Sequence, residues 1–229
     1  MYDEKEDKTM AFFGSFKKSA LELKTIRCIV VTGLLIALEL AIKSVTVTVS
    51  PDLKVSFAFL AKASIGMLFG PTVSFLSGIV SDVISFMIKP TGTFSPLFTL
   101  QEGLAGMLYG LFFYEMRMSR INFHDKAQFK QSLKGNGKQI LRIILGKLSV
   151  TVGINLLYTP LALVITNSMA AGEWVWGSVL VKYPARLLKN AIQYPVDCFM
   201  LILVLPIVST AYYLVFKGIK RLFGEKQHE

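Results

Sequence analysis

Residues 89–103 read KPTGTFSPLFTLQEG, a stretch that joins a loop to the start of an apolar helix. Proline and glycine interrupt its first half, whereas its second half is apolar except for Gln101 and Glu102. A carboxylate and an amide at the mouth of a membrane helix are costly unless a polar group meets them. We therefore predict that these two side chains face a pocket for a small polar ligand.

The rest of the chain has the composition of an integral membrane protein. It contains 229 residues, 53% of them hydrophobic, and its mean hydropathy is +0.53. Its apolar runs are long enough to cross a bilayer, which takes roughly 20 helical residues. We predict an all-α protein, a bundle of six transmembrane helices at about 28–49, 55–69, 72–88, 97–114, 140–165 and 184–216. Residues 174–186 could form either a surface helix or an extension of the sixth span.

Basic residues set the orientation and the domain boundaries. Segments 1–27, 116–142 and 217–229 hold 17 of the 25 Lys and Arg residues. Six spans place these three segments on one side, and an excess of Lys and Arg marks the cytoplasmic side. We expect both termini to be cytoplasmic, with a segment at 1–26, a membrane domain at 27–218 that contains a polar cytoplasmic loop at 119–138, and a tail at 219–229.

The start of the sixth span carries a polar face. Arg186, Lys189, Asn190 and Gln193 are spaced by three or four residues, so they share one side of a helix. A cationic and amide-bearing face suits a carboxylate ligand, which Arg binds through two parallel hydrogen bonds. The alternative is that the basic residues only extend to the lipid head groups.

Glu102 offers the opposite charge. A carboxylate in a dry pocket could pair with the two adjacent donors of an amino-pyrimidinone ring, or it could form an internal salt bridge to Arg186, Lys62 or Lys147. Phe98 lies one turn earlier and could stack on a flat ring or serve in packing.

Two further groups have open roles. Asn155 and Tyr158 on the fifth span could bind the ligand or join helices. Lys62 and Asp82 are predicted to form a structural pair. The small residues Gly33, Ala37 and Ala41 recur every four positions along the first span, which allows another helix to approach closely. That helix could belong to this chain or to another subunit.

Several activities lack a basis in the sequence. No phosphate-binding Gly-x-x-x-x-Gly-Lys-Ser/Thr loop is present, and the two histidines, His124 and His228, lie in polar segments. We therefore expect neither an enzyme nor a metal site. The basic residues follow the loops of a membrane protein, so we also expect no nucleic-acid partner.

Three segments resemble those of a known family. The Gly66–Pro71 turn, the loop from Lys89 through Leu100 with the Gly106–Gly110 run, and the stretch Pro184–Asn190 are similar to segments of the substrate-binding S components of energy-coupling factor (ECF) vitamin transporters, most of all the folate family. The similarity covers roughly residues 27–218. The chain differs from the family pattern at Ser95–Phe98 and at Gln101 and Glu102, which fall in the predicted pocket.

The resemblance implies a function. An S component captures a vitamin from outside the plasma membrane of a bacterium and binds no ATP itself. It docks on a transmembrane coupling subunit that carries two ATPases, and the stripe of Gly33, Ala37 and Ala41 resembles the surface presented to that subunit. The ligand implied is folate, bound by Phe98, Thr99, Gln101, Glu102, Asn155, Tyr158, Arg186, Lys189 and Asn190.

Other readings stay open. The cargo could be pantothenate, a queuosine precursor or another vitamin. A stand-alone secondary carrier would be expected to show two pseudo-symmetric halves with paired broken helices, which the sequence lacks. A purely structural scaffold would leave the polar residues of the predicted pocket unexplained.

Overall fold

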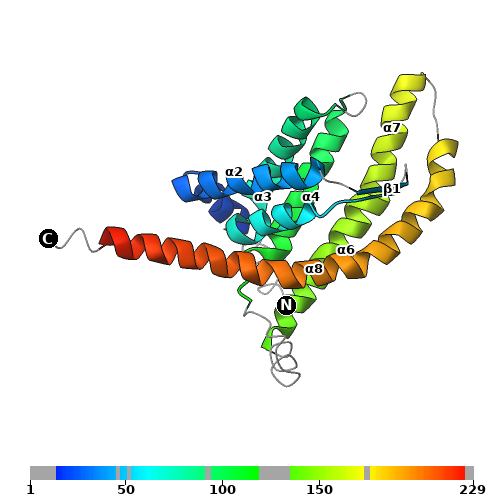
Figure 1. The fold of residues 1–229 in the computed structure, drawn as a ribbon. Helices are drawn as coiled ribbons and strands as arrows, with labels where there is room; N and C mark the ends of the chain where they lie inside the picture. Colours follow the sequence, from blue (N-terminus) through cyan, green and yellow to red (C-terminus); the bar gives the residue numbers. More distant parts are fainter. Residues whose placement is uncertain are drawn as a thin grey trace, which may run out of the picture.

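The computed structural model describes residues 14–44, 47–50, 53–90, 94–118, 135–172 and 176–224, and it is built almost entirely from helices (Figure 1). The elements with their bounds are α2 (Ile26–Ser44), β1 (Val47–Ser50), β2 (Leu53–Val55), α3 (Phe59–Ile88), α4 (Pro96–Phe113), α6 (Gly137–Ser149), the π-helix η1 (Val150–Tyr158), α7 (Thr159–Ala171) and α8 (Gly177–Gly224). A short helix, Gly14–Glu22, precedes α2 at an angle of 88°.

The predicted second and third spans both lie within α3. Gly70 interrupts this helix with φ 85° and ψ −172°, a conformation open to glycine but not to residues with a Cβ, and Pro71 follows. The Ser74 hydroxyl donates to the carbonyl of Lys62 at 3.4 Å. Twelve residues of straight helix would separate these groups by about 18 Å, so the two halves of α3 fold back on each other.

Ser19 of the N-terminal helix completes this turn. Its hydroxyl donates to the Phe69 carbonyl at 2.6 Å and accepts from the backbone N–H groups of Thr72 at 3.0 Å and Val73 at 3.2 Å. Breaking the helix at Gly70 leaves these backbone groups without their usual partners, and unpaired groups in a buried place are costly. One buried serine therefore stabilises the reversal of the chain.

Helices α6, η1, α7 and α8 form a second layer beside α2, α3 and α4. Helices α6, η1 and α7 follow one another without a break and form a single long rod, and α8 curves alongside it (Figure 1). Gly172 ends α7 in the left-handed conformation with φ 73°. Three prolines, Pro184, Pro195 and Pro206, lie inside α8 and remove backbone donors along its curved path.

The outer surface is apolar, as expected in lipid. On α8, Val181, Leu188 and Ile192 are exposed, whereas Asn190 and Gln193 line an internal cavity. Among the described residues, three helical stretches are long and apolar enough to span a membrane, Phe59–Ile88, Gly137–Met169 and Val179–Phe216, and the bent pair of Gly14–Glu22 with α2 would be a fourth. Since α3 reverses at Gly70 and α4 matches the predicted fourth span within one residue, each of the six predicted spans has a helical counterpart in the described chain, in the predicted order.

Some predicted boundaries were wrong. The first span ends at Ser44 rather than at 49, and an antiparallel hairpin of β1 and β2 follows, in which Val47 faces Val55. The alternating Val47-Thr48-Val49 is β-branched and favours a strand. The sixth helix starts at Gly177, so its described residues extend that span toward the N-terminus. The predicted polar loop at 119–138 lies mostly outside the described residues.

Candidate functional site

A cavity of about 990 Å³ lies between the two layers of helices. Helices α2, α3 and α4 supply one side, and α6, η1, α7 and the first third of α8 supply the other. Its lining includes two exposed residues, Lys89, which caps α3, and Lys182 near the start of α8. We call the part of the cavity that they line the mouth. The buried side chains of Tyr109 and Lys147 line another part, which we call the floor.

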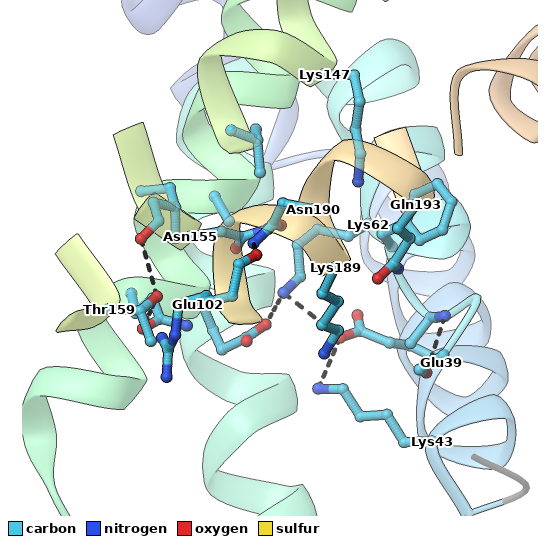
Figure 2. A pocket seen from close by; sticks show the side chains of 18 of the residues that line it. Glu39, Lys43, Lys62, Glu102, Lys147, Asn155, Thr159, Lys189, Asn190 and Gln193 are labelled. Atoms are coloured by element: carbon cyan, nitrogen blue, oxygen red, sulfur yellow. Dashed lines mark hydrogen bonds and ion pairs between the residues drawn. The ribbon is translucent and has the colours of Figure 1, made fainter. Parts of the chain in front are cut away.

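Six of the predicted site residues line this cavity together. Arg186, Lys189 and Asn190 reach it from α8, and Asn155 reaches it from η1. Gln101 reaches it from α4. Glu102 also reaches it from α4 (Figure 2). Residues separated by more than 80 positions in the sequence thus line one cavity.

The structure places the other three predicted residues elsewhere. Thr99 is buried, and its hydroxyl donates to Asp82 at 2.7 Å, a contact between α4 and α3. The Tyr158 hydroxyl donates to the carbonyl of Leu97 at 3.1 Å. Phe98 is partly buried and is not among the cavity residues. The first two act in helix packing here, because their hydroxyl groups are already engaged within the bundle.

Lys62 is the centre of an ion-pair network. Its ammonium group contacts the carboxylate of Glu102 directly and lies 3.6 Å from Oε1 of Glu39. Lys43 lies 2.9 Å from the same oxygen of Glu39 (Figure 2). The predicted pairing of Lys62 with Asp82 is therefore wrong. Of the three salt-bridge partners considered for Glu102, which were Arg186, Lys62 and Lys147, the structure shows Lys62. Glu39 is 1% exposed, and its carboxylate has no hydrogen-bond partner among the described residues, so the charges of the two lysines compensate its own.

A second ion pair forms the floor. Lys147 lies 2.7 Å from Oδ2 of Asp197 and donates to the Tyr109 hydroxyl at 3.4 Å. Its ammonium group is also 4.3 Å from the centre of the Phe59 ring, within range of a cation–π contact. Both charged partners are buried, and isolated charges there would be strongly unfavourable, so each stabilises the other.

Amide side chains form contacts between helices, both within the second layer and between the two layers. Asn155 donates to the side-chain oxygen of Asn190 at 3.0 Å, which links η1 to α8. The Thr159 hydroxyl lies 3.0 Å from Oε1 of Gln101 and 2.8 Å from the carbonyl of Ile154. Helix–helix contact and cavity lining are thus combined in Asn155. The π-helix includes Val150, Ile154 and Asn155 among the cavity residues, and such segments are frequent at functional sites.

The charges of the cavity are unequal. Seven basic side chains line it, against two acidic ones: Lys43, Lys62, Lys89, Lys147, Lys182, Arg186 and Lys189, against Glu39 and Glu102. Within the described part of the chain, no hydrogen bond or ion pair engages the guanidinium of Arg186. This excess of positive charge favours an anionic ligand that also carries hydrogen-bond donors.

Sequence reasoning missed several of these residues. Glu39 and Lys43 were visible as charges inside an apolar span, a signal of function in itself, but their partners depend on packing. Lys147 and Thr159 were not assigned to the site. They lie eight residues before and four residues after Asn155, spacings that place side chains on one face of a helix.

The fold and the cavity define a class, a polytopic helical membrane protein with a charged binding cavity between its helices. A family model described as the S component of the ECF-type riboflavin transporter matches residues 23–187, and the chain belongs to this family. The resemblance to ECF S components found in the sequence is thereby confirmed.

Relatives with a common name support this assignment. The chain is 27% identical to the folate transporter FolT of Clostridium novyi over 179 residues, 78% of this chain and 88% of the relative. It is 35% identical to FolT of Streptococcus mutans over 98 residues, 42% of this chain and 53% of the relative. FolT of Leuconostoc mesenteroides is 27% identical over 173 residues, 75% of this chain and 80% of the relative.

A solved structure matches the fold as well. The crystal structure of FolT bound with folic acid aligns with a TM-score of 0.59 and 28% sequence identity, covering 76% of this chain and 89% of that one. The predicted class of helical membrane bundle is confirmed, and the chain is an S component of a transporter.

Proposed function

We propose that this chain is the folate-binding S component of an ECF-type importer in the plasma membrane of a bacterium. The supporting observation is the cavity that brings Arg186 and Lys189 together with Glu102 in one space. The likeness to FolT structures and sequences supports folate as the cargo.

Folate matches both signs of charge in this cavity. Its glutamyl tail carries two carboxylates, which suit Arg186 and Lys189 of α8. Its pterin ring presents adjacent N–H donors, which suit the carboxylate of Glu102, and the amides of Gln101, Asn155 and Asn190 supply further hydrogen bonds. Since Lys62 already contacts Glu102, the ring would have to share or exchange that contact.

Riboflavin is the second candidate, because the matching family model is described by it. It has a flat ring but no carboxylate, so it leaves the excess of basic side chains in the cavity without a counter-charge. Pantothenate has a carboxylate but no flat ring with paired donors. Charge complementarity therefore favours folate over both.

Titration in nanodiscs tests the cargo. The full chain is titrated with folic acid, riboflavin or pantothenate, and binding is followed by calorimetry and by the fluorescence of tryptophan, including the half-exposed Trp176. We expect saturable binding of folic acid, with riboflavin and pantothenate at least a hundredfold weaker. Tighter binding of either competitor would overturn the choice of folate.

The chain would work with partner subunits through α2. Gly33, Ala37 and Ala41 are all exposed, and a Cβ added at Gly33 would meet no atom within 4 Å. We propose that this stripe docks on a transmembrane coupling subunit that carries two ATPases. The Gly33→Leu variant should keep folate binding and lose copurification with that subunit. Retained copurification would contradict the docking surface.

A further inference from the structure

Lys62 of α3 is shared between two carboxylates that belong to different helices. Its ammonium group contacts Glu102 of α4 directly and lies 3.6 Å from Oε1 of Glu39 of α2 (Figure 2). All three side chains line the cavity. Glu102 is the more accessible acid, since its side chain is 28% exposed and that of Glu39 is 1% exposed. A ligand in the cavity therefore reaches Glu102 more easily than Glu39.

Glu39 can accept a further hydrogen bond. Neither of its carboxylate oxygens has a hydrogen-bond partner among the described residues, although the ammonium group of Lys43 lies 2.9 Å from Oε1. A carboxylate offers about four lone-pair positions on its two oxygens. A charge-assisted N–H···O bond is about 2.7–2.9 Å long, so Lys62 has to approach Oε1 by only about 1 Å to form one.

Of the two lysines beside Glu39, Lys62 is the one that can exchange partners. Lys43 also donates to the Ser81 hydroxyl at 3.3 Å, which anchors it next to Glu39. Among the described residues, the ion pairs of Lys62 are those with Glu102 and Glu39. A lysine carries a compact charge on a flexible stem, so a small shift of its end group transfers the charge from one acid to the other.

We infer that Lys62 is a movable counter-ion: when paired N–H donors of the ligand bind Glu102, its ammonium group moves onto Glu39. This inference rests on the proposed function, which places the pterin ring at Glu102. Glu39 is then a positioning residue, because it holds Lys62 away from Glu102 without touching the ligand. Glu39, Glu102, Lys43 and Lys62 carry two charges of each sign, so a neutral ring can bind while every buried charge keeps a partner.

Without the charge of Glu39, this exchange would be unfavourable. Lys62 is buried, and a buried ammonium group that loses its counter-charge is strongly destabilised. The Glu39→Gln variant keeps the size of the side chain and removes its charge. Lys62 should then stay on Glu102 and compete with the ligand, so we expect folic acid binding to weaken at least about tenfold.

Two charge-balanced double variants separate positioning from a general loss of charge balance. Glu39→Gln is combined either with Lys62→Met or with Lys43→Met, and calorimetry in nanodiscs measures folic acid binding to each full-length variant and to the unmodified chain. The first double variant removes the competitor for Glu102, so it should bind within about threefold of the unmodified chain. The second has the same net charge but keeps Lys62 on Glu102, so it should stay at least about tenfold weaker.

The possible outcomes separate the exchange from the proposed function. Equal affinity of the two double variants would overturn the exchange, and so would an unchanged affinity of Glu39→Gln. If Glu39→Gln alone does not fold, the comparison of the two double variants decides, because neither contains an excess charge. Failure of the unmodified chain to bind folic acid would overturn the proposed function, and the exchange with it.

Discussion

The α3–α4 layer and the α6–α8 layer are held together by different means. In the first, backbones touch: a Cβ added at Gly106 would lie 2.3 Å from the carbonyl oxygen of Ser74, and one at Gly78 would lie 2.4 Å from that of Glu102. The most apolar stretch of α3 is 67% buried. The corresponding stretches of Gly137–Met169 and Val179–Phe216 are only 28% and 22% buried.

This difference separates stability from recognition. Close packing of backbones makes α3 and α4 a unit that tolerates no added volume. The second layer meets that unit across a cavity, through side-chain hydrogen bonds such as that between Gln101 and Thr159. We expect substitutions in the first layer to affect folding, and most cavity substitutions of the second layer to affect ligand affinity.

The largest effect is expected at Gly106. The Gly106→Val variant places a branched side chain against the backbone of Ser74, which cannot move aside. Overpacking typically costs 1–3 kcal/mol, and a clash with backbone should cost at least about 3 kcal/mol. Size-exclusion profiles and thermal melting in detergent should show loss of folded protein.

Gly153→Val is the matched control in the second layer. There the nearest atom to an added Cβ is Cδ1 of Leu108, at 4.0 Å. We expect a change in melting temperature of no more than a few degrees. A loss of folded protein comparable to that of Gly106→Val would show that the two layers are equally intolerant and would remove the contrast.

Substitution of Asp197 tests whether the second layer also contains a contact that is essential for stability. The Asp197→Leu variant leaves Lys147 buried without its counter-charge, and breaking a buried pair in this way costs about 3–5 kcal/mol. A strong decrease in melting temperature is expected. The double variant Lys147→Met with Asp197→Leu should recover most of it, because no isolated charge remains. No recovery would mean that the contacts of Lys147 with Tyr109 and Phe59 matter more than the pair.

Arg186 tests recognition without stability. Hydrogen bonds to charged groups contribute about 1.5–3 kcal/mol, so Arg186→Ala should weaken folic acid binding roughly tenfold to a hundredfold. The melting temperature of the ligand-free protein should not change. Pteroic acid, which lacks the glutamyl group, should lose much less affinity. Equal losses for both ligands would contradict binding of the tail by Arg186.

The smallest effect is expected at Thr159, which joins the two layers. Thr159→Val keeps the shape and removes the hydroxyl contacts to Gln101 and to the carbonyl of Ile154. A hydrogen bond of this kind contributes about 1 kcal/mol, so folic acid should bind no more than about fivefold more weakly. Calorimetry resolves this difference. A loss of affinity as large as that of Arg186→Ala would contradict this expectation and would show that the contact between Thr159 and Gln101 positions other ligand-binding groups.

The sequence allowed the order of the helices and part of the site to be predicted. Hydropathy located the spans because the lipid-facing side chains remain apolar, as Leu188 and Ile192 do. Helical spacing was enough to group Arg186, Lys189 and Asn190 on one face, and these residues line one cavity with Glu102.

The rest depended on packing that no local pattern contains. Lys62 could have paired with any acid at a similar depth, and the reversal of α3 at Gly70 decided for Glu102 and Glu39 over Asp82. The π-helical register of η1 leaves no trace in hydropathy, because it changes which neighbours meet and not which residues are apolar. Thr99 and Tyr158 had hydroxyl groups in the right region, but these groups joined helices.

Helix α2 has two faces with different surroundings. One presents Gly33, Ala37 and Ala41 to the outside of the bundle, and the other places Glu39 against Lys43 and Lys62. Since Lys62 also contacts Glu102, any guest that competes for Glu102 changes the electric field at Glu39. The electrostatic effect of a bound ligand therefore has to cross only one helix, α2, to reach the exposed stripe on its outer face.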